Sequence, residues 1–545
     1  MGSDIAARRQ EYLEGVIARF EGLSMAPLDG RAWSLNHARL ALGRDVGEAN
    51  RYFASAQLTR DRDFMGIRLL KTLLDFGGTP KLGSEARRHL ESAFVAWPVE
   101  EVNTVARWPA LNTENHDLMH LTIGLFAERL RGNPVDERVR QLCRSLAWRF
   151  ARGWLEWNSP RYQLHYLNPL MVLADHAPAD RLREGAQALV NVQLAERALL
   201  SVNGYLAGPF FRGWDRHRLE GPDGRPVQRG ACAYFDNNRY DAYLATMWIV
   251  FGLAEPCYDY TRTPELEPAG EGYGCGGDAR LNQDEGMAVA ASDFVPHPIV
   301  GALAAEAAAR PCLVYRGTRP SGWPPHRLWG DNPPLAQLYY HNTPHVSMGS
   351  LQSCGWSHQT RYCSIMFADE PSMNLRIDRV LPGVQWDRWR QERRGELAQH
   401  RGWLLGRGEL VEDGAVRPVR TGTVNLYRVG KGMIAHTALD SEYHVLQAGD
   451  LDQFASEDEF LARVTPPTRK GHVVEGETAE GDRVAVDVRD MSISVNGTRR
   501  ERWDDMLHDS EPMASVYGSG AIHIRTAEGE LTLDHSALIE ELARA

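Results

Sequence analysis

The sequence predicts a multidomain α + β protein. An N-terminal (α/α) toroid of helical hairpins is expected over residues 1–310, and a C-terminal antiparallel β-sandwich over residues 311–545. Apolar residues recur at helical spacing through the first part, whereas apolar and polar residues alternate in the second. A stretch rich in Pro, Gly and Arg, between 309 and 338, separates the two patterns. We therefore expect two packed domains with a groove between or above them.

The helical part divides into segments of roughly ten to twenty residues, joined by short links that Pro or Gly marks. An amphipathic first segment is closed by Ile17, Phe20 and Leu23. Further helices are expected over 64–76, 84–97, 114–131, 136–155, 161–174, 180–200, 240–253 and 297–309. Consecutive helical hairpins of this size are typical of an α/α array or toroid.

Alternating runs in the second part predict strands at 361–368, 423–430, 484–495 and 521–535. Asn496-Gly497 and Glu528-Gly529 stand where hairpin turns would join neighbouring strands. This pattern favours an antiparallel β-sandwich.

Composition limits the classes of partner. The chain has 545 residues, 43% of them apolar and 24% charged, and its 15 Trp exclude wholesale disorder. A net charge of −11 argues against nucleic acid, and no stretch is long enough to span a bilayer, so no membrane is expected. The seven cysteines are scattered without a CxxC pair, which favours a reducing compartment. A cytoplasmic location is expected, unless a signal peptide was removed from a secreted or periplasmic protein.

The segment around His116 opens a strongly amphipathic helix, with Asn112 or Thr113 as its N-cap. Asn115 and His116 would lie in the first turn, where a His tends to stay neutral and suits proton transfer. The alternative is that both side chains only satisfy local backbone groups.

The same segment resembles the zinc-protease pattern HExxH, since His116 and His120 are four residues apart. Asp117 replaces the Glu that would act as general base, and no third ligand with a recognisable spacing follows. Zinc hydrolysis is therefore a minor alternative.

A second polar helix start follows. Ser159 is a natural N-cap and Pro160 a natural first residue, which puts Tyr162 in the first turn and Tyr166 one turn later on the same face. Core packing of the two tyrosines is the alternative.

Together the two segments resemble the heparinase II/III and alginate-lyase type of polysaccharide lyase. In that family an Asn-His pair opens one helix of an α/α toroid, and a Glu-x-Ser-Pro-x-Tyr-like string opens a later one. Here the strings are Asn115-His116 and 156–162, with one extra residue between Glu156 and Ser-Pro. The family also has helices followed by a β-sandwich.

The resemblance implies β-elimination on a uronate-containing oligo- or polysaccharide, with no cofactor required and a homodimer left open. Asn115, with His116, would neutralise the C5 carboxyl group, and Tyr162 would protonate the leaving oxygen. Tyr162 would also act as base if an Arg lay close by. The candidates are Arg161, Arg212, Arg216 and Arg239.

The family often takes a further catalytic residue from the edge of the β domain. The string 338–350 supplies Tyr340 and His345 as candidates, although the family's His-x-His-x-Asp run is missing there. His341 and His345 would share a strand face and are the pair expected to bind any structural divalent metal.

Substrate contacts are expected from Tyr166 and from two polar, aromatic segments, 204–214 and 236–240, because aromatic faces stack on sugars and Arg pairs with carboxylates. The residues concerned in these segments are Arg212, Trp214, Arg239 and Tyr240. A loop tucked over the toroid is the alternative for 204–214.

Three other functions remain open. A glycoside hydrolase on the same toroid would need two carboxylates across a cleft, and Glu114, Asp117 and Asp236 are available. The others are a binding protein that keeps the fold without its chemistry, and an enzyme that eliminates from a small metabolite.

Overall fold

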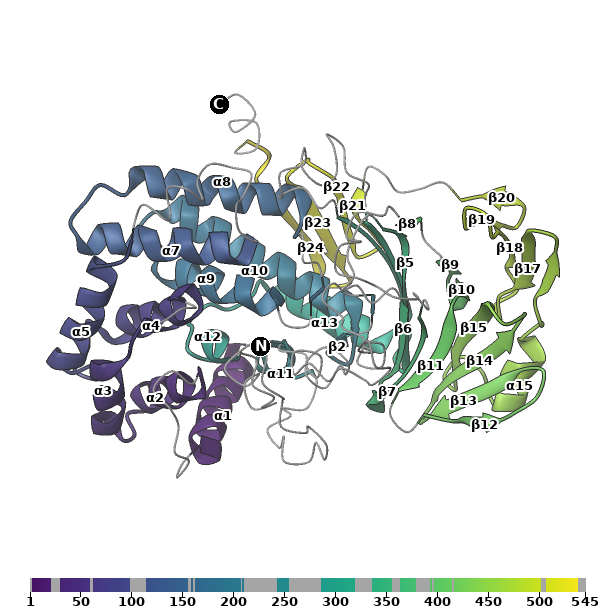
Figure 1. Ribbon diagram of the computed structural model, residues 1–545, viewed down its shortest axis with the longest axis horizontal. Helices are drawn as coiled ribbons and strands as arrows, with labels where there is room; N and C mark the ends of the chain where they lie inside the picture. Colours follow the sequence, from purple (N-terminus) through teal and green to yellow (C-terminus); the bar gives the residue numbers. More distant parts are fainter. Residues whose placement is uncertain are drawn as a thin grey trace, which may run out of the picture.

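The computed structural model places helices first and antiparallel strands afterwards, as the sequence predicts (Figure 1). The fold is therefore mixed α + β. The residues that the structure describes are 2–20, 30–58, 62–98, 114–154, 158–159, 162–206, 208–209, 243–253, 286–318, 336–354, 363–378, 393–394, 397–413, 416–500 and 506–537. Within them, no helix is both long and apolar enough to cross a bilayer.

The helices follow the predicted segments closely. They are α1 (Gly2–Phe20), α2 (Gly30–Leu42), α3 (Val46–Ser55), α4 (Arg62–Phe76), α5 (Ser84–Val95), α7 (Glu114–Leu130), α8 (Asp136–Arg152), α9 (Tyr162–His176), α10 (Asp180–Leu200), α11 (Leu244–Phe251), α12 (Met287–Ala290), α13 (Pro298–Ala309) and α15 (Glu457–Arg463). The predicted helix over 136–155 stops earlier, because Gly153 adopts a positive φ of 72°. The sequence did not predict α2, α3, α12 or α15. Of these, α3 is short and mostly polar and buries only Ala49 and Phe53.

Three of these helices begin at the same end of the helical part. In the second position of α4, Asp63 contacts His116 in the first turn of α7, and the neighbouring Phe64 contacts His165 in the first turn of α9. The helices α4, α7 and α9 also pack against one another. Their first turns therefore converge, while α8 lies on the outer side of this group and packs against α7 and α10 (Figure 1).

The strands form three larger antiparallel sheets and one hairpin. The hairpin is β1 (Ser201–Val202) with β2 (Tyr205–Leu206). The 11-stranded sheet has the order β11 (Glu409–Asp413), β7 (Glu370–Asp378), β6 (Cys363–Phe367), β5 (Val346–Cys354), β4 (Ala336–Asn342), β3 (Cys312–Thr318), β21 (Met506–Asp509), β22 (Met513–Val516), β23 (Ala521–Thr526) and β24 (Gly529–Asp534), with β8 (Arg393–Arg394) paired to β5.

The six-stranded sheet has the order β12 (Pro418–Arg420), β13 (Asn425–Val429), β14 (Gly432–Ala438), β15 (Tyr443–Asp450), β10 (Trp403–Arg407) and β9 (Leu397–His400). The five-stranded sheet runs in chain order through β16 (Thr468–Lys470), β17 (Val473–Glu477), β18 (Arg483–Asp487), β19 (Ser492–Val495) and β20 (Thr498–Arg499). The turn from β19 to β20 confirms the predicted hairpin, since Asn496 and Gly497 have φ of 51° and 83°.

The six-stranded sheet buries both of its faces. Leu404 joins an apolar cluster with Ile365 of the 11-stranded sheet. The next residue, Leu405, points the opposite way and joins a cluster with Val474 and Val486 of the five-stranded sheet. The strand β10 therefore lies in the middle of three stacked layers (Figure 1).

The predicted boundary near 310 coincides with the change from helix to strand, since α13 ends at Ala309 and β3 begins at Cys312. The hydrophobic core does not stop there. The cluster that fills the helical part also contains Leu338 of β4 and Ile522 of β23, which lie in the 11-stranded sheet. The two predicted parts therefore share one core, and the C-terminal strands return to the helices (Figure 1).

Candidate functional site

The converging first turns of α4, α7 and α9 bring an acidic side chain onto two histidines. Nδ1 of His116 and Oδ2 of Asp63 share a hydrogen bond. Nε2 of His120, one turn further along α7, lies 3.8 Å from the same oxygen. The Asp63 side chain is 6% exposed and that of His116 is 35% exposed, so the imidazole is accessible while the carboxylate lies beneath it.

One aromatic ring joins the starts of α7 and α9. The ring of Phe64 makes edge contacts with His116 and His165, at centroid distances of 5.0 and 4.5 Å. The residue Tyr162, with which α9 begins, is three positions before His165. The structure thus brings together the two helix starts that the sequence singled out.

The two histidines determine the charge of Asp63. Burial favours a raised pKa for this carboxyl group, but the hydrogen bond from His116 and the positive charges of His116 and His120 outweigh it and lower the pKa. Asp63 is therefore ionised at neutral pH.

The neighbouring polar residues of α7 are buried. Asn115 lies in the first turn, as predicted, and is fully buried, while Asp117 is 3% exposed. Asn115 therefore has no exposed surface for the predicted contact with a substrate carboxyl group in this structure.

Several predicted site residues lie outside the part of the chain that the structure describes. The backbone of Tyr162 is described as the first residue of α9, but its side chain lies outside the described part, as does that of Glu114. The others that lie outside it are Arg161, Arg212, Trp214, Arg216, Asp236, Arg239 and Tyr240.

A buried arginine that the sequence did not single out lies beside the start of α9. Arg197, in the last turn of α10, donates a hydrogen bond of 3.2 Å to Oε1 of Gln163, the residue after Tyr162. Its guanidinium lies 5.3 Å from the ring centroid of Tyr243. Burial lowers the pKa of Arg197 to about 9, which still leaves it charged at neutral pH. Arg197 therefore places positive charge beside the start of α9.

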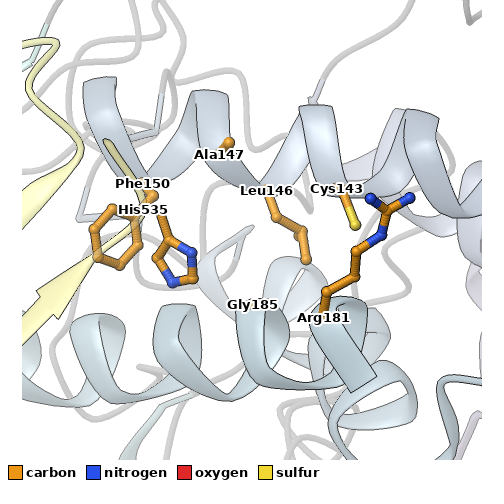
Figure 2. Close-up of a pocket in the computed structure, with 7 residues that line it drawn as sticks. All are labelled: Cys143, Leu146, Ala147, Phe150, Arg181, Gly185 and His535. Carbon is orange, nitrogen blue, oxygen red and sulfur yellow. The ribbon is translucent and has the colours of Figure 1, made fainter. Parts of the chain in front are cut away.

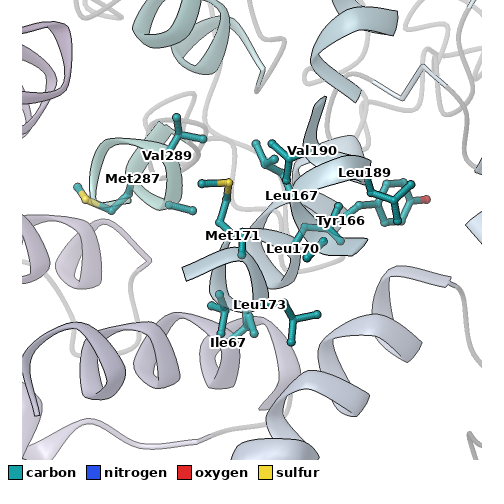
Figure 3. Packing of buried hydrophobic residues seen from close by; sticks show 14 of the residues in the cluster. Ile67, Tyr166, Leu167, Leu170, Met171, Leu173, Leu189, Val190, Met287 and Val289 are labelled. Carbon is teal, nitrogen blue, oxygen red and sulfur yellow. The ribbon is translucent and has the colours of Figure 1, made fainter. Parts of the chain in front are cut away.

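Tyr166 packs in the helical core. Its side chain is fully buried, and its ring stacks on Trp154 at 4.1 Å with an interplanar angle of 8°. Figure 3 shows Tyr166 among Leu167, Leu170 and Leu189. A ring covered in this way has no free face for a sugar, so this position agrees with the packing alternative and not with the predicted substrate contact.

Tyr340 of β4 does reach the segment before α9. Its hydroxyl donates a hydrogen bond of 2.9 Å to the carbonyl of Pro209 and accepts one of 2.8 Å from Nδ2 of Asn158. The side chain is fully buried. Its proton is thus already donated within the protein.

The two histidines near Tyr340 face different surroundings. Nε2 of His345 lies 2.8 Å from a carboxylate oxygen of Asp452, in the turn after β15. His341 is buried, and neither of its ring nitrogens has a hydrogen-bond partner among the described residues. Burial, with the positive charge of Arg401, lowers the pKa of His341 to about 4.

Within the described ranges, His341 and His345 belong to no group of three close metal-ligand atoms, and neither do His116 and His120. The one such group found there is Asp75, Asp175 and His176, at the far ends of α4 and α9. The ammonium of Lys71 lies 3.1 Å from both carboxylates and supplies the positive charge in that place.

A small pocket lies elsewhere, between α8 and α10 (Figure 2). Its polar lining consists of Cys143, Arg181 and His535, and its apolar lining includes Leu146 and Phe150. None of the predicted site residues lines it.

Sequence reasoning missed Asp63, Phe64, His165 and Arg197. The first three lie in first turns of parallel helices, which is the position that singled out His116 and Tyr162. Treating the first turn of 64–76 in the same way would have found Asp63 and Phe64. A scan against family models matches none to this chain, and a search of curated proteins finds no match.

Proposed function

We propose that this protein is a lyase that cleaves a uronate-containing oligo- or polysaccharide by β-elimination. The observation that carries the proposal is the contact of Phe64 with both His116 and His165, because it joins the helix starts that hold Asn115-His116 and Tyr162. The parallel course of α4, α7 and α9 favours a toroid of helical hairpins. The stacked sheets favour a β-sandwich.

The electrostatics suit an acidic sugar. Three helix N-termini converge, and each carries partial positive charge that favours a carboxylate. Arg197 adds a full charge below the start of α9. In the proposed reaction a base at the helix starts accepts the C5 proton, the electron pair of the C5–H bond forms the C4=C5 bond, and the C4–O4 bond breaks. Tyr162 then protonates the leaving oxygen.

The hydrolase alternative has less support. It needs two carboxyl groups across a cleft, one of them a general acid. The two that the structure describes at the helix starts are Asp63 and Asp117, and both are buried. Asp63 is in addition engaged by His116.

The test is ultraviolet absorbance of the new C4=C5 bond across a panel of uronate glycans: alginate, glucuronan, heparan, chondroitin, hyaluronan and pectin fragments. Absorbance should grow with at least one substrate and be lost in Tyr162→Phe, which removes only a hydroxyl. The matched control is Tyr427→Phe, whose hydroxyl bonds Glu412 in the β part. It should retain wild-type turnover.

Other outcomes identify the alternatives. New reducing ends without absorbance would indicate a hydrolase. Stabilisation by an acidic glycan without turnover would indicate a binding protein. Silence of the folded protein across the panel, or full turnover by Tyr162→Phe, would contradict the proposal.

A further inference from the structure

We infer that Asp63 is a positioning residue, which holds the ring proton of His116 on Nδ1 and so makes Nε2 of His116 the group that accepts the substrate proton. This inference rests on the proposed lyase function. It assigns the base to His116 and leaves Tyr162 with the acid role alone.

The contact itself determines where the proton lies. An ionised carboxylate only accepts hydrogen bonds, so Nδ1 of His116 must donate to Asp63. The carboxylate is buried on the first turn of α4, and Phe64 packs against the edge of the imidazole. Both contacts restrict rotation of the ring. A neutral His116 held in this way carries its lone pair on Nε2.

A lone pair on Nε2 suits proton removal and not carboxylate recognition. The lone pair on Nε2 would repel a substrate carboxylate. Asn115 and Arg197 are buried, so recognition of the carboxyl group falls to the partial positive charge of the helix N-termini. In the reaction the C5 proton moves to Nε2 of His116, the C4=C5 bond forms, and O4 leaves with the proton of Tyr162. Asp63 stabilises the imidazolium that results.

His120 is the competing imidazole. Its Nε2 is 3.8 Å from Asp63, its ring lies 5.7 Å from that of Trp97, and its side chain is only 15% exposed. His116 is 35% exposed and is thus the more accessible of the two. Among the side chains that the structure describes, the other titratable groups near this pair are Asp117 on the same helix and His165 across Phe64.

The test measures the chemistry of His116 directly. Diethyl pyrocarbonate modifies an unprotonated imidazole nitrogen, and peptide mass spectrometry follows its reaction with His116 as a function of pH. In Asp63→Asn the midpoint for His116 should move to lower pH by about one unit, because the imidazolium loses its carboxylate. The exposed His523, in the same digest, should not change. His120→Gln should leave the His116 midpoint in place.

Steady-state kinetics provide the second test. Asp63→Asn should lower kcat roughly 100-fold or more with KM nearly unchanged, because the base is misaligned while the substrate still binds. The control is His523→Gln, at an exposed histidine of β23, which should retain kcat. A purely structural Asp63 would leave the His116 midpoint unmoved, and that result would overturn the inference even in an active lyase.

The inference and the proposed function can fail separately. A shifted midpoint in a protein that cleaves no uronate glycan would sustain the positioning role and reject the lyase. If Asp63→Asn does not fold, ring nitrogen-15 shifts of wild-type His116, assigned by difference from His116→Gln, decide the question. A protonated Nε2 in the neutral ring would refute the inference, whereas a protonated Nδ1 would support it.

Discussion

Glu196 in α10 and His508 in β21 share a hydrogen bond of 2.7 Å, although 312 positions separate them in the chain. Nδ1 of the same imidazole lies 2.7 Å from Oγ of Ser515 in β22. Glu196 and His508 are 3% and 4% exposed. The pair connects the C-terminal strands to the helical part from within the shared core.

Replacing His508 should therefore destabilise the whole protein. His508→Ala leaves the buried Glu196 carboxylate without this donor and should lower the free energy of unfolding by about 3 kcal/mol. Urea denaturation measures the effect. The control is Glu137→Gln, which breaks an exposed ion pair with Arg140 and should cause no measurable loss. An equal response of the two variants would show that the buried pair contributes nothing.

Lys71 should be needed to keep the carboxylate of Asp75 ionised. Burial favours a raised pKa for Asp75, but the charge of Lys71 and hydrogen bonds from His176 and His37 lower it. Lys71→Met should cost roughly 3–5 kcal/mol at neutral pH, because Asp75 and Asp175 lose their cation.

The loss of stability in Lys71→Met should depend on pH. The lowered pKa of Asp75 stabilises the wild-type protein above the carboxyl group's ordinary value, and this contribution is lost as pH falls. Asp75 is protonated more easily in Lys71→Met, so the loss of stability relative to wild type should be smaller at pH 4 than at pH 7. Lys431→Met, which breaks an exposed pair with Asp452, should show no such change. A deficit that stayed constant would contradict the assigned role of Lys71.

Two cross-strand histidines should make the β part sensitive to acid. Nε2 of His436 lies 3.0 Å from Nδ1 of His444, and Asn425 faces the other side of the His436 ring. Burial, and then the charge of His444, lowers the pKa of His436 to about 4. Asp440 and Glu409 act on His444 in the opposite direction.

A lowered histidine pKa means that the unfolded chain binds more protons between pH 6.5 and about 4. The free energy of unfolding should therefore decrease as the pH is lowered through that window. In His436→Gln this decrease should be smaller. Denaturation at several pH values measures it, with the exposed His523→Gln as control. Identical pH profiles for His436→Gln and wild type would exclude the histidine pair as the cause.

Tyr340 should prove structural. Tyr340→Phe deprives the carbonyl of Pro209 and the amide of Asn158 of a partner, and should cost about 1–3 kcal/mol of stability. Thermal unfolding and turnover, measured on the same preparation, separate the roles. A catalytic Tyr340 would instead lose turnover with its stability unchanged.

Local patterns predicted much of this protein. The periods of apolar residues gave α10 its bounds, and the Asn496-Gly497 dipeptide its hairpin, because helices, strands and turns depend on nearby residues. Cap and first-turn chemistry located Glu114 at a helix start and Tyr162 in the first turn of another helix. These predictions required no knowledge of which elements touch.

Contacts between distant elements were decided by tertiary structure alone. Spacing in the sequence indicates which face a residue occupies, but not which helix or strand packs against that face. The contact of Asp63 with His116, and the stacking of Tyr166 on Trp154, depend on how α4, α7, α8 and α9 pack. Tyr162 and Tyr166 looked alike as first-turn and second-turn tyrosines. Packing buried Tyr166 completely, because its ring stacks on Trp154 within the helical core.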